Sequence, residues 1–218
     1  MINRVVQHCL CLLLVVLAAQ AQAADKPNIV ILATGGTIAG SAECQTQAGY
    51  TSGQVGVDIL INAVPQIKEI ANISGEQVAN VGSQDMSDAI WLKLAERVNA
   101  LAAKSDVDGI VITHGTDTLE ETSYFLSLVT QGTKPVVMVG SMRPATAVSA
   151  DGPANIYNAV AVAINPEAEG RGTLVSLKDE IHYARNVVKT NTNSLQTFES
   201  VNRGPAGVVH TGTVKWFE

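Results

Sequence analysis

Residues 29–40 read IVILATGGTIAG, a run of strand-forming residues followed by a glycine turn that carries a hydroxyl group. Five consecutive apolar residues are typical of a strand covered on both faces. Gly35 and Gly36 permit positive φ and let a ligand approach the backbone closely. The turn therefore presents Thr37 at a strand end. Three interpretations are open at this point: a nucleotide-phosphate loop, a plain β-turn, and a nucleophile turn in which Thr37 attacks.

The rest of the chain alternates strand-like and helix-like segments. Residues 109–113 and 135–139 are further Val/Ile-rich runs, and each ends at a turn signal. Helical patterns cover residues 88–104, where Asp88 is a plausible N-cap, residues 120–129, and residues 153–164, which begin with a proline. Repeated strand–helix units predict an α/β fold with a mostly parallel sheet flanked by helices. Ligands bind such sheets beyond the carboxyl ends of the strands.

The first 24 residues have the features of a secretory signal peptide. Arg4 precedes a continuous apolar run over residues 9–19, and Ala21-Gln22-Ala23 forms an A-x-A cleavage site. The apolar run is shorter than the ~20 residues that span a bilayer. We therefore expect cleavage near Ala23–Ala24, a periplasmic or secreted protein, and one folded domain over residues 25–218.

Composition limits the partners and the redox chemistry. The chain carries 14 basic and 20 acidic residues, for a net charge of −6, and loss of Arg4 with the leader makes it more acidic. This balance argues against nucleic acid or an anionic membrane as a partner. Cys9 and Cys11 lie in the leader, so Cys44 would be the only cysteine left and no intrachain disulfide could form.

Spacing removes the nucleotide interpretations of the first turn. A dinucleotide fingerprint requires glycine at its third position, where this chain has Thr37. Gly35 and Gly40 have the spacing of a P-loop, but Ser41-Ala42 replaces the required lysine and hydroxyl pair. A triphosphate would therefore lack its counter-charge.

Common hydrolase patterns are also missing from the sequence. It contains neither a G-x-S-x-G elbow nor metal-ligand spacing among His114, His182 and His210. We expect these histidines to be core or surface residues, because nothing near them in sequence completes a catalytic dyad. Cys44 has no adjacent histidine to activate it, so we expect an unreactive thiol.

Two threonine turns remain, and both have polar companions. Tyr50 follows Thr37 in a glycine-rich loop that could fold over a site, where it would relay a proton; the alternative is a surface aromatic residue. Thr116 and Asp117 follow the second strand-like run. Asp117 could hold an ammonium group, cap the following helix, or do both.

Two further stretches add polar side chains. Ser83 and Gln84 follow a short apolar run, and Lys189 lies among hydroxyl-bearing residues. A buried lysine can act as a base once its pKa is lowered. Judged alone, however, a lysine such as Lys189 is expected to be exposed to solvent.

Taken together, four separated motifs resemble those of the bacterial-type L-asparaginases, in particular the exported type II enzymes. They are ATGGTIAG at residues 33–40, GSQDM at 82–86, THGTDTLEE at 113–121 and KTNT at 189–192. MRP at residues 142–144 and SADGP at 149–153 also look like this family. The resemblance runs from about Lys26 to the last residue, and four motifs in order are far more specific than any one alone.

The resemblance implies an amidohydrolase that converts L-asparagine to L-aspartate and ammonia without a metal or organic cofactor. Thr37 matches the nucleophile that forms an acyl-enzyme, and Tyr50 matches the tyrosine beside it. Thr116, Asp117 and Lys189 match a second polar set. Ser83, Gln84 and Asp117 match the groups that hold the α-carboxylate and α-ammonium of the substrate. Gln84 favours asparagine over glutamine, with some glutaminase activity expected because one methylene gives only ~1–3 kcal/mol of discrimination.

The same resemblance implies parts beyond residue 218. Family members have a smaller carboxyl-terminal domain that supplies a glutamate near the nucleophile, and they form homotetramers with sites between subunits. We therefore expect the 218-residue chain alone to show little or no turnover. The alternative hypothesis is a non-catalytic amino-acid-binding or assembly module.

Overall fold

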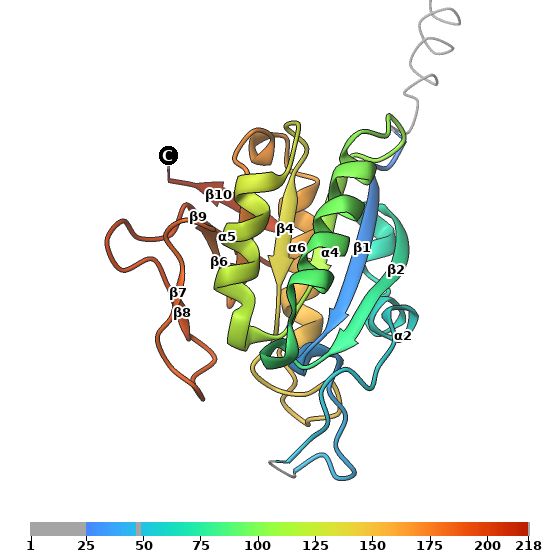
Figure 1. The fold of residues 1–218 in the computed structure, drawn as a ribbon, viewed down its shortest axis with the longest axis vertical. Coiled ribbons are helices and arrows are strands. Elements are labelled where there is room, and N and C mark those ends of the chain that lie inside the picture. Colours follow the sequence, from blue (N-terminus) through green and yellow to red (C-terminus); the bar gives the residue numbers. More distant parts are fainter. Residues whose placement is uncertain (1–24, 47–48, 218) are drawn as a thin grey trace, which may run out of the picture.

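The computed structural model describes residues 25–46 and 49–217 and is built on an eight-stranded sheet (Figure 1). The proposed signal peptide lies outside the described residues. The strand order is β10-β9-β6-β5-β4-β3-β1-β2. In that order the bounds are β10 (Thr213–Trp216), β9 (Gly207–His210), β6 (Glu180–Tyr183), β5 (Thr173–Leu177), β4 (Val136–Val139), β3 (Gly109–Thr113), β1 (Asn28–Gly35) and β2 (Asn72–Val81).

Strands β1 to β5 are mutually parallel, which confirms the predicted α/β class with a mostly parallel sheet. β1 lies between β2 and β3, with Ile31 opposite Gly75 on one side and Val111 on the other. Its residues from Ile29 to Gly35 are all buried, as the continuous apolar run predicts. β1 therefore lies in the interior of the sheet, with paired strands on both sides.

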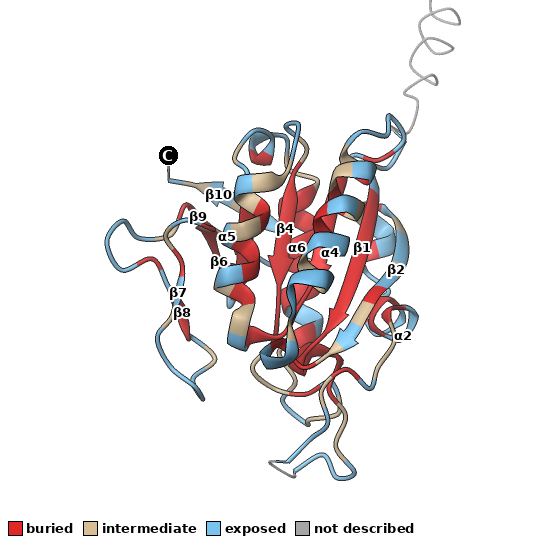
Figure 2. Cartoon of the chain, in the orientation of Figure 1, coloured by how far each residue is buried: buried red, intermediate tan, exposed pale blue. Residues whose placement is uncertain are grey.

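Helices cover both faces of the sheet, and the side chains of β1 alternate between the two resulting cores (Figure 2). Val30 and Leu32 pack with α4 (Asp88–Ala102) and α5 (Leu119–Val129). Ile29 and Ile31 pack with the helices of the other face, which are α2 (Val57–Asn62), α3 (Ile67–Ile70) and α6 (Gly152–Ala163). This period-2 alternation is what a doubly covered strand requires.

Helix ends depart slightly from the sequence expectation. Ser87 rather than Asp88 occupies the N-cap position of α4, and the helix ends at Ala102 instead of residue 104. α5 and α6 each begin one residue earlier than predicted, and α6 keeps its proline in the first turn. Such shifts are normal for boundaries inferred from periodicity. No helix in the described ranges is long and apolar enough to cross a lipid bilayer.

One edge of the sheet was not predicted from sequence. β6, β9 and β10 extend it with antiparallel pairs, and tight turns join β5 to β6 and β9 to β10. Lys178, Asp179 and Thr211 take positive φ in these turns, where Asn-Gly or Asp-Gly is the usual sequence signal. A separate pair, β7 (Val188–Lys189) and β8 (Phe198–Glu199), forms a two-stranded sheet beside α5 (Figure 1).

Candidate active site

Three short 3-10 turns meet at the carboxyl edge of the parallel sheet. They are η1 (Thr37–Ala39) after β1, η2 (Ser83–Asp85) after β2, and η3 (Thr116–Thr118) after β3. β1 lies between β2 and β3, and beyond its end the turns η2 and η3 contact each other directly through Ser83. The sheet order therefore brings together polar residues that are as much as 80 positions apart in sequence.

Glycines allow these turns to approach one another closely. Gly36 has φ +80°, and a Cβ atom there would lie 2.2 Å from the Cα atom of Gly115. A Cβ atom on Gly115 would lie 2.5 Å from the Oγ atom of Ser83. Side chains at either position would force the turns apart. Gly36 is thus required by its contact with the Gly115 backbone as well as by its positive φ, whereas Gly115, with φ −72°, is required by its contact with Ser83.

Thr37 and Tyr50 form the first polar pair. Their hydroxyl oxygens lie 2.7 Å apart, and either oxygen can be the donor. Thr37 is buried, whereas Tyr50 is 39% exposed. Ser41 and Thr51 form an isolated antiparallel bridge, and Gly53 N–H donates to the carbonyl of Gly36. The loop that carries Tyr50 is therefore joined to the turn that carries Thr37, and Tyr50 contacts Thr37 rather than lying apart on the surface.

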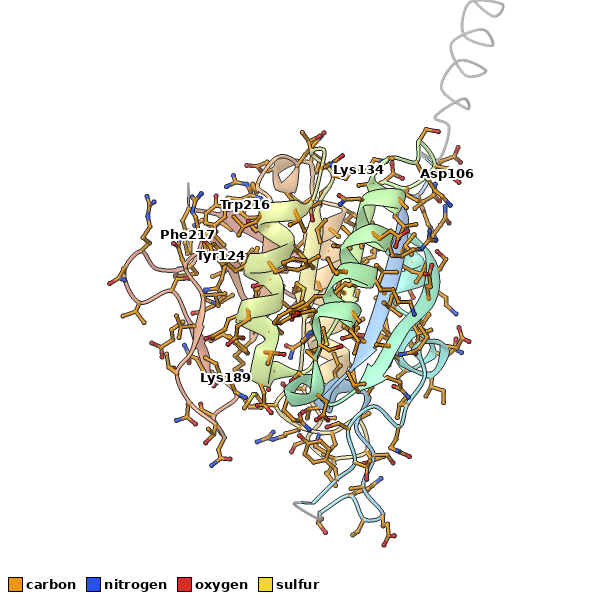
Figure 3. The ribbon with its side chains drawn as sticks, in the orientation of Figure 1. Asp106, Tyr124, Lys134, Lys189, Trp216 and Phe217 are labelled. Atoms are coloured by element: carbon orange, nitrogen blue, oxygen red, sulfur yellow. The ribbon has the colours of Figure 1, made fainter. Side chains whose placement is uncertain are left out.

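Lys189 joins the second threonine turn. Its Nζ atom donates to Thr116 Oγ1 at 3.0 Å and to Asp117 Oδ1 at 2.7 Å. The Lys189 side chain is only 15% exposed, against 61% for Asp117, so the expectation of a solvent-exposed lysine is wrong. Local sequence does not reveal the burial of Lys189, because β7 places it against Thr116 and Asp117, which lie far away in the sequence. Lys189 lies toward the end of the molecule where the parallel strands end (Figure 3).

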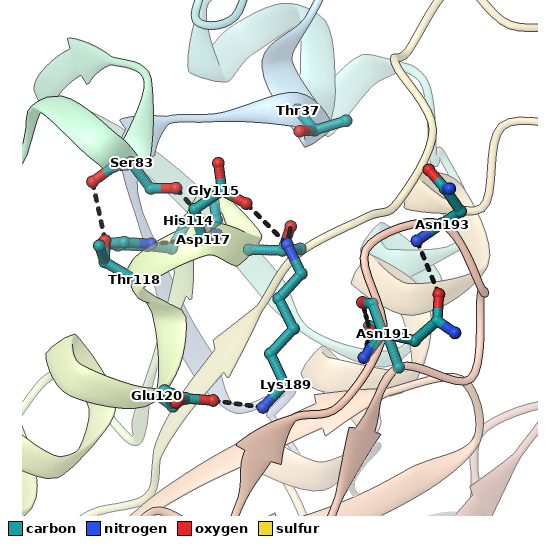
Figure 4. Close-up of polar contacts among 12 residues, drawn as sticks. Thr37, Ser83, His114, Gly115, Asp117, Thr118, Glu120, Lys189, Asn191 and Asn193 are labelled. Atoms are coloured by element: carbon teal, nitrogen blue, oxygen red, sulfur yellow. Dashed lines mark hydrogen bonds and ion pairs between the residues drawn. The ribbon is translucent and has the colours of Figure 1, made fainter.

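Asp117 does not occupy the N-cap position of α5. That position belongs to Thr118, because the chain first makes the 3-10 turn η3. The backbone N–H of Asp117 donates to Ser83 Oγ at 3.0 Å, and Thr118 Oγ1 donates to the Ser83 carbonyl at 2.8 Å (Figure 4). Buried Ser83 therefore links η2 to η3 and leaves the Asp117 carboxylate at the surface of the cleft.

A cleft of about 340 Å³ opens between these turns. Its polar lining comes from both threonine turns, from the loop that carries Tyr50 and from η2: Gly36, Thr37, Gly49, Tyr50, Ser52, Ser83, Gln84 and Asp117. Sequence reasoning did not single out Ser52, although it lies in the same glycine-rich loop as Tyr50. In the described part of the chain, no group of three or more His, Cys, Asp or Glu side chains is arranged to hold a metal ion.

His114 adjoins the second turn but faces the interior. Trp91 Nε1 donates to Thr122 Oγ1 at 2.8 Å, and Thr122 Oγ1 lies 3.0 Å from His114 Nε2. Because the Gly115 carbonyl can only accept, Nδ1–H of His114 donates to it at 2.6 Å, and Nε2 of the neutral ring accepts from the Thr122 hydroxyl. Burial lowers the pKa of His114 to about 4, although the hydrogen bond to Gly115 opposes the shift. The ring is neutral at pH 7, and its hydrogen bond to the Gly115 carbonyl stabilises the turn.

The other two described histidines lie away from the cleft. His182 is buried, with Nδ1 3.0 Å from Ser200 Oγ, and burial lowers its pKa to about 4. His210 is exposed, and its Nδ1 atom lies 3.7 Å from Asp179 Oδ2. Both agree with the expectation of core or surface roles. Exposed Cys44 likewise lies outside the lining of the cleft.

Residues 28–218 match the family model described as the N-terminal part of asparaginase. The chain belongs to the asparaginase family. It is 56% identical over 190 residues to "L-asparaginase 2" of Escherichia coli strain K12, a match that covers 87% of this chain and 54% of that protein. It is also 56% identical over 196 residues to the "Probable L-asparaginase periplasmic" of Haemophilus influenzae, covering 90% of this chain and 56% of the relative.

A solved asparaginase structure shares the fold. The probable cytoplasmic L-asparaginase of Campylobacter jejuni superposes with a TM-score of 0.86 at 50% sequence identity, covering 88% of this chain and 59% of that one. The chain therefore spans little more than half the length of these asparaginases. Its turns at η1, η2 and η3 all lie within the segment that the family model matches.

Proposed function

We propose that this chain forms the N-terminal catalytic domain, residues 25–218, of an enzyme that hydrolyses L-asparagine to L-aspartate and ammonia. The observation that carries the proposal is the convergence of two polar sets on one edge of the sheet. Thr37 pairs with Tyr50, and Thr116 pairs with Lys189 and Asp117. The family membership and the names of the relatives add independent support.

Thr37 is the proposed nucleophile. Its Oγ1 atom attacks the side-chain amide carbon while its proton passes through the Tyr50 hydroxyl to the departing nitrogen. The C–N bond breaks, ammonia leaves, and an ester links the acyl group to Thr37. Water then adds to the ester carbon and returns a proton to the Thr37 oxygen as the C–O bond breaks. A threonine hydroxyl is a weak nucleophile, which is why a hydroxyl partner at 2.7 Å matters.

The remaining polar groups would bind and orient the substrate. Ser83 and Gln84 suit the α-carboxylate, because a hydroxyl and a side-chain amide can both donate to it. Asp117 suits the α-ammonium as a partly exposed carboxylate. Thr116 and Lys189 form the proposed second catalytic set; they lie outside the lining of the cleft and join it through Asp117. Backbone N–H groups of the two threonine turns would stabilise the oxyanion.

Replacing Thr37 with alanine, in the complete reading frame that contains this chain, tests the assignment. Ammonia release from asparagine should fall at least ~10³-fold, because the acyl-forming atom is lost. Thr213→Ala serves as the control, since that threonine is exposed on β10, remote from the cleft. Activity retained in Thr37→Ala while the thermal midpoint matches that of the control would reject Thr37 as the nucleophile.

Amino-acid binding without turnover is a second candidate for the 218-residue chain alone. It is favoured because Ser83, Gln84 and Asp117 all line the cleft of this chain, whereas the resemblance puts a further glutamate outside residues 25–218. Titration calorimetry with asparagine, run beside an ammonia assay on the same sample, separates the two candidates. Turnover comparable to a full-length asparaginase would exclude the binding-only candidate.

Substrate preference, location and assembly are further proposals. Asparagine should be preferred over glutamine, and equal kcat/KM values for the two amides would count against that preference.

An exported location with cleavage near Ala23–Ala24 is supported by the leader pattern and by a relative that is named periplasmic. Amino-terminal sequencing of the mature protein tests it. A homotetramer is proposed by resemblance and is tested by light scattering.

A further inference from the structure

Glu120 lies next to the proposed catalytic turn but outside the lining of the cleft. It is the second residue of α5, two positions after the end of η3, which carries Thr116 and Asp117. Its neighbour Leu119 is fully buried in the core. The backbone of Glu120 is therefore rigidly connected to the turn. Its side chain is half-buried and points toward β7 (Figure 4).

The Glu120 carboxylate accepts a hydrogen bond from the backbone N–H of Lys189, through Oε2. Neighbouring N–H groups along a strand point to opposite sides. Thr190 N–H donates to Thr197 across the β7–β8 pair, so the Lys189 N–H points away from that pair and toward α5. Glu120 thus pairs a backbone donor that the small sheet leaves unpaired, and a charged acceptor makes this bond stronger than a neutral one.

The β7–β8 pair needs such a tether. It is separate from the eight-stranded sheet. Phe198 of β8 and Val187, the residue before β7, pack in the core, and Ser200, just after β8, contacts His182 of β6, but none of these contacts is made by Lys189. Apolar packing is not directional, so it does not by itself fix the position of the Lys189 backbone. The Nζ atom must nevertheless reach Thr116 and Asp117 within 3.0 Å. Only a fixed backbone holds a long, flexible side chain at that distance reliably.

We propose that Glu120 is a positioning residue, which holds the backbone of Lys189 so that its amine reaches Thr116 and Asp117. The inference rests on the proposed function only for its kinetic consequence. The tether itself concerns two segments of the fold and does not require that Lys189 be catalytic. Glu120 touches neither substrate nor reacting atoms, and it acts through Lys189 alone.

Three variants in the complete reading frame separate this role from a general effect of charge. Glu120→Ala removes the acceptor, and Glu120→Gln keeps an acceptor oxygen without the charge. Glu121→Ala is the matched control, because Glu121 lies in the same helical turn, carries the same charge and is exposed. A helix-dipole effect would be similar for Glu120 and Glu121.

Hydrogen exchange at the Lys189 amide, measured by NMR without substrate, tests the tether directly. Exchange should quicken at least ~10-fold in Glu120→Ala, quicken less in Glu120→Gln, which keeps a neutral acceptor, and stay close to wild type in Glu121→Ala. Unchanged exchange in Glu120→Ala would overturn the proposal. This outcome is independent of whether the protein hydrolyses asparagine.

Steady-state kinetics test the consequence. In Glu120→Ala, kcat for asparagine should fall by about 10- to 100-fold while KM changes little, since a displacement near 1 Å has that effect on rate. Glu120→Gln should restore kcat to within about 3-fold of wild type. Equal losses of kcat in Glu120→Ala and Glu120→Gln, or an equal loss in Glu121→Ala, would overturn positioning by this hydrogen bond. Changed exchange with no activity in any form, wild type included, would instead reject the proposed function and leave the tether standing.

Discussion

Individual side chains at the cleft differ in exposure, and that difference matches what each would do. Thr37 is buried, so its hydroxyl meets little competing water, while Tyr50, whose hydroxyl lies 2.7 Å from it, is 39% exposed. The Asp117 side chain is more open, at 61% exposed. A charged substrate group would therefore reach Asp117 more readily than the proposed nucleophile Thr37.

Tyr50→Phe tests the proton relay at this scale. The ring keeps its packing and only the hydroxyl is lost, so kcat should fall by about 10²- to 10⁴-fold while KM stays within a few-fold. Tyr124→Phe is the control, because Tyr124 is an exposed tyrosine on α5. An unchanged kcat in Tyr50→Phe would show that Tyr50 serves only as a cover.

Much of the site was predictable from residues close to strand ends. Thr37, Ser83, Gln84, Thr116 and Asp117 all closely follow parallel strands, and the strand-end rule places such residues together. Lys189 could be assigned only by resemblance, because its contacts depend on a small sheet with no strong sequence signal. The Glu120 contact had no signal at all, since a glutamate in a first helical turn is ordinary.

Turns and strands determine how closely the proposed catalytic groups approach one another. The contact between Gly36 and Gly115 is especially tight, and it is made by backbone atoms that cannot move aside independently. The sequence indicated that Gly35 and Gly36 let a ligand approach the backbone closely. It did not indicate that Gly36 contacts the backbone of another turn. The parallel core was predictable from its apolar runs. The antiparallel edge was not, because Lys178 and Asp179 are not typical of a tight hairpin.

Gly36→Ala tests this contact. A matched control is Gly132→Ala, because Gly132 has a similar φ of +87° but no atom within 4 Å of the position that an added methyl group would take. Gly132→Ala should lower the free energy of unfolding by about 1 kcal/mol from backbone strain alone. Gly36→Ala should lower it by ~3 kcal/mol or more, because β3 and its turn must shift as well. Urea unfolding measures both, and equal losses would contradict the contact.

At the scale of the whole molecule, buried titratable groups make stability depend on pH. His114 has a folded-state pKa of about 4, below the ordinary value of 6.5. Between these values the unfolded chain takes up a proton that the folded chain does not. The stabilisation is complete above about pH 6.5 and is lost as the pH falls toward 4. His182 acts with the same sign, whereas burial, and secondarily Glu199, raise the pKa of Glu180, which acts in the opposite sense.

We therefore predict that the free energy of unfolding falls between pH 6.5 and 4, with His114 contributing up to about 3 kcal/mol. His114→Gln should flatten this dependence by close to one proton, since an amide does not titrate. Urea unfolding at a series of pH values gives the slope. A slope that is the same in wild type and His114→Gln would show that His114 titrates normally.

The position of β1 between β2 and β3 has a consequence for synthesis on the ribosome. β1 emerges first among the strands, yet one of its two neighbours, β3, ends at Thr113, nearly 80 residues later. At ~5–20 residues per second, its apolar side chains wait several seconds for that partner. Until then they are exposed to chaperones and to other nascent chains. The strand that leads into the proposed nucleophile turn would thus benefit from protection during biosynthesis.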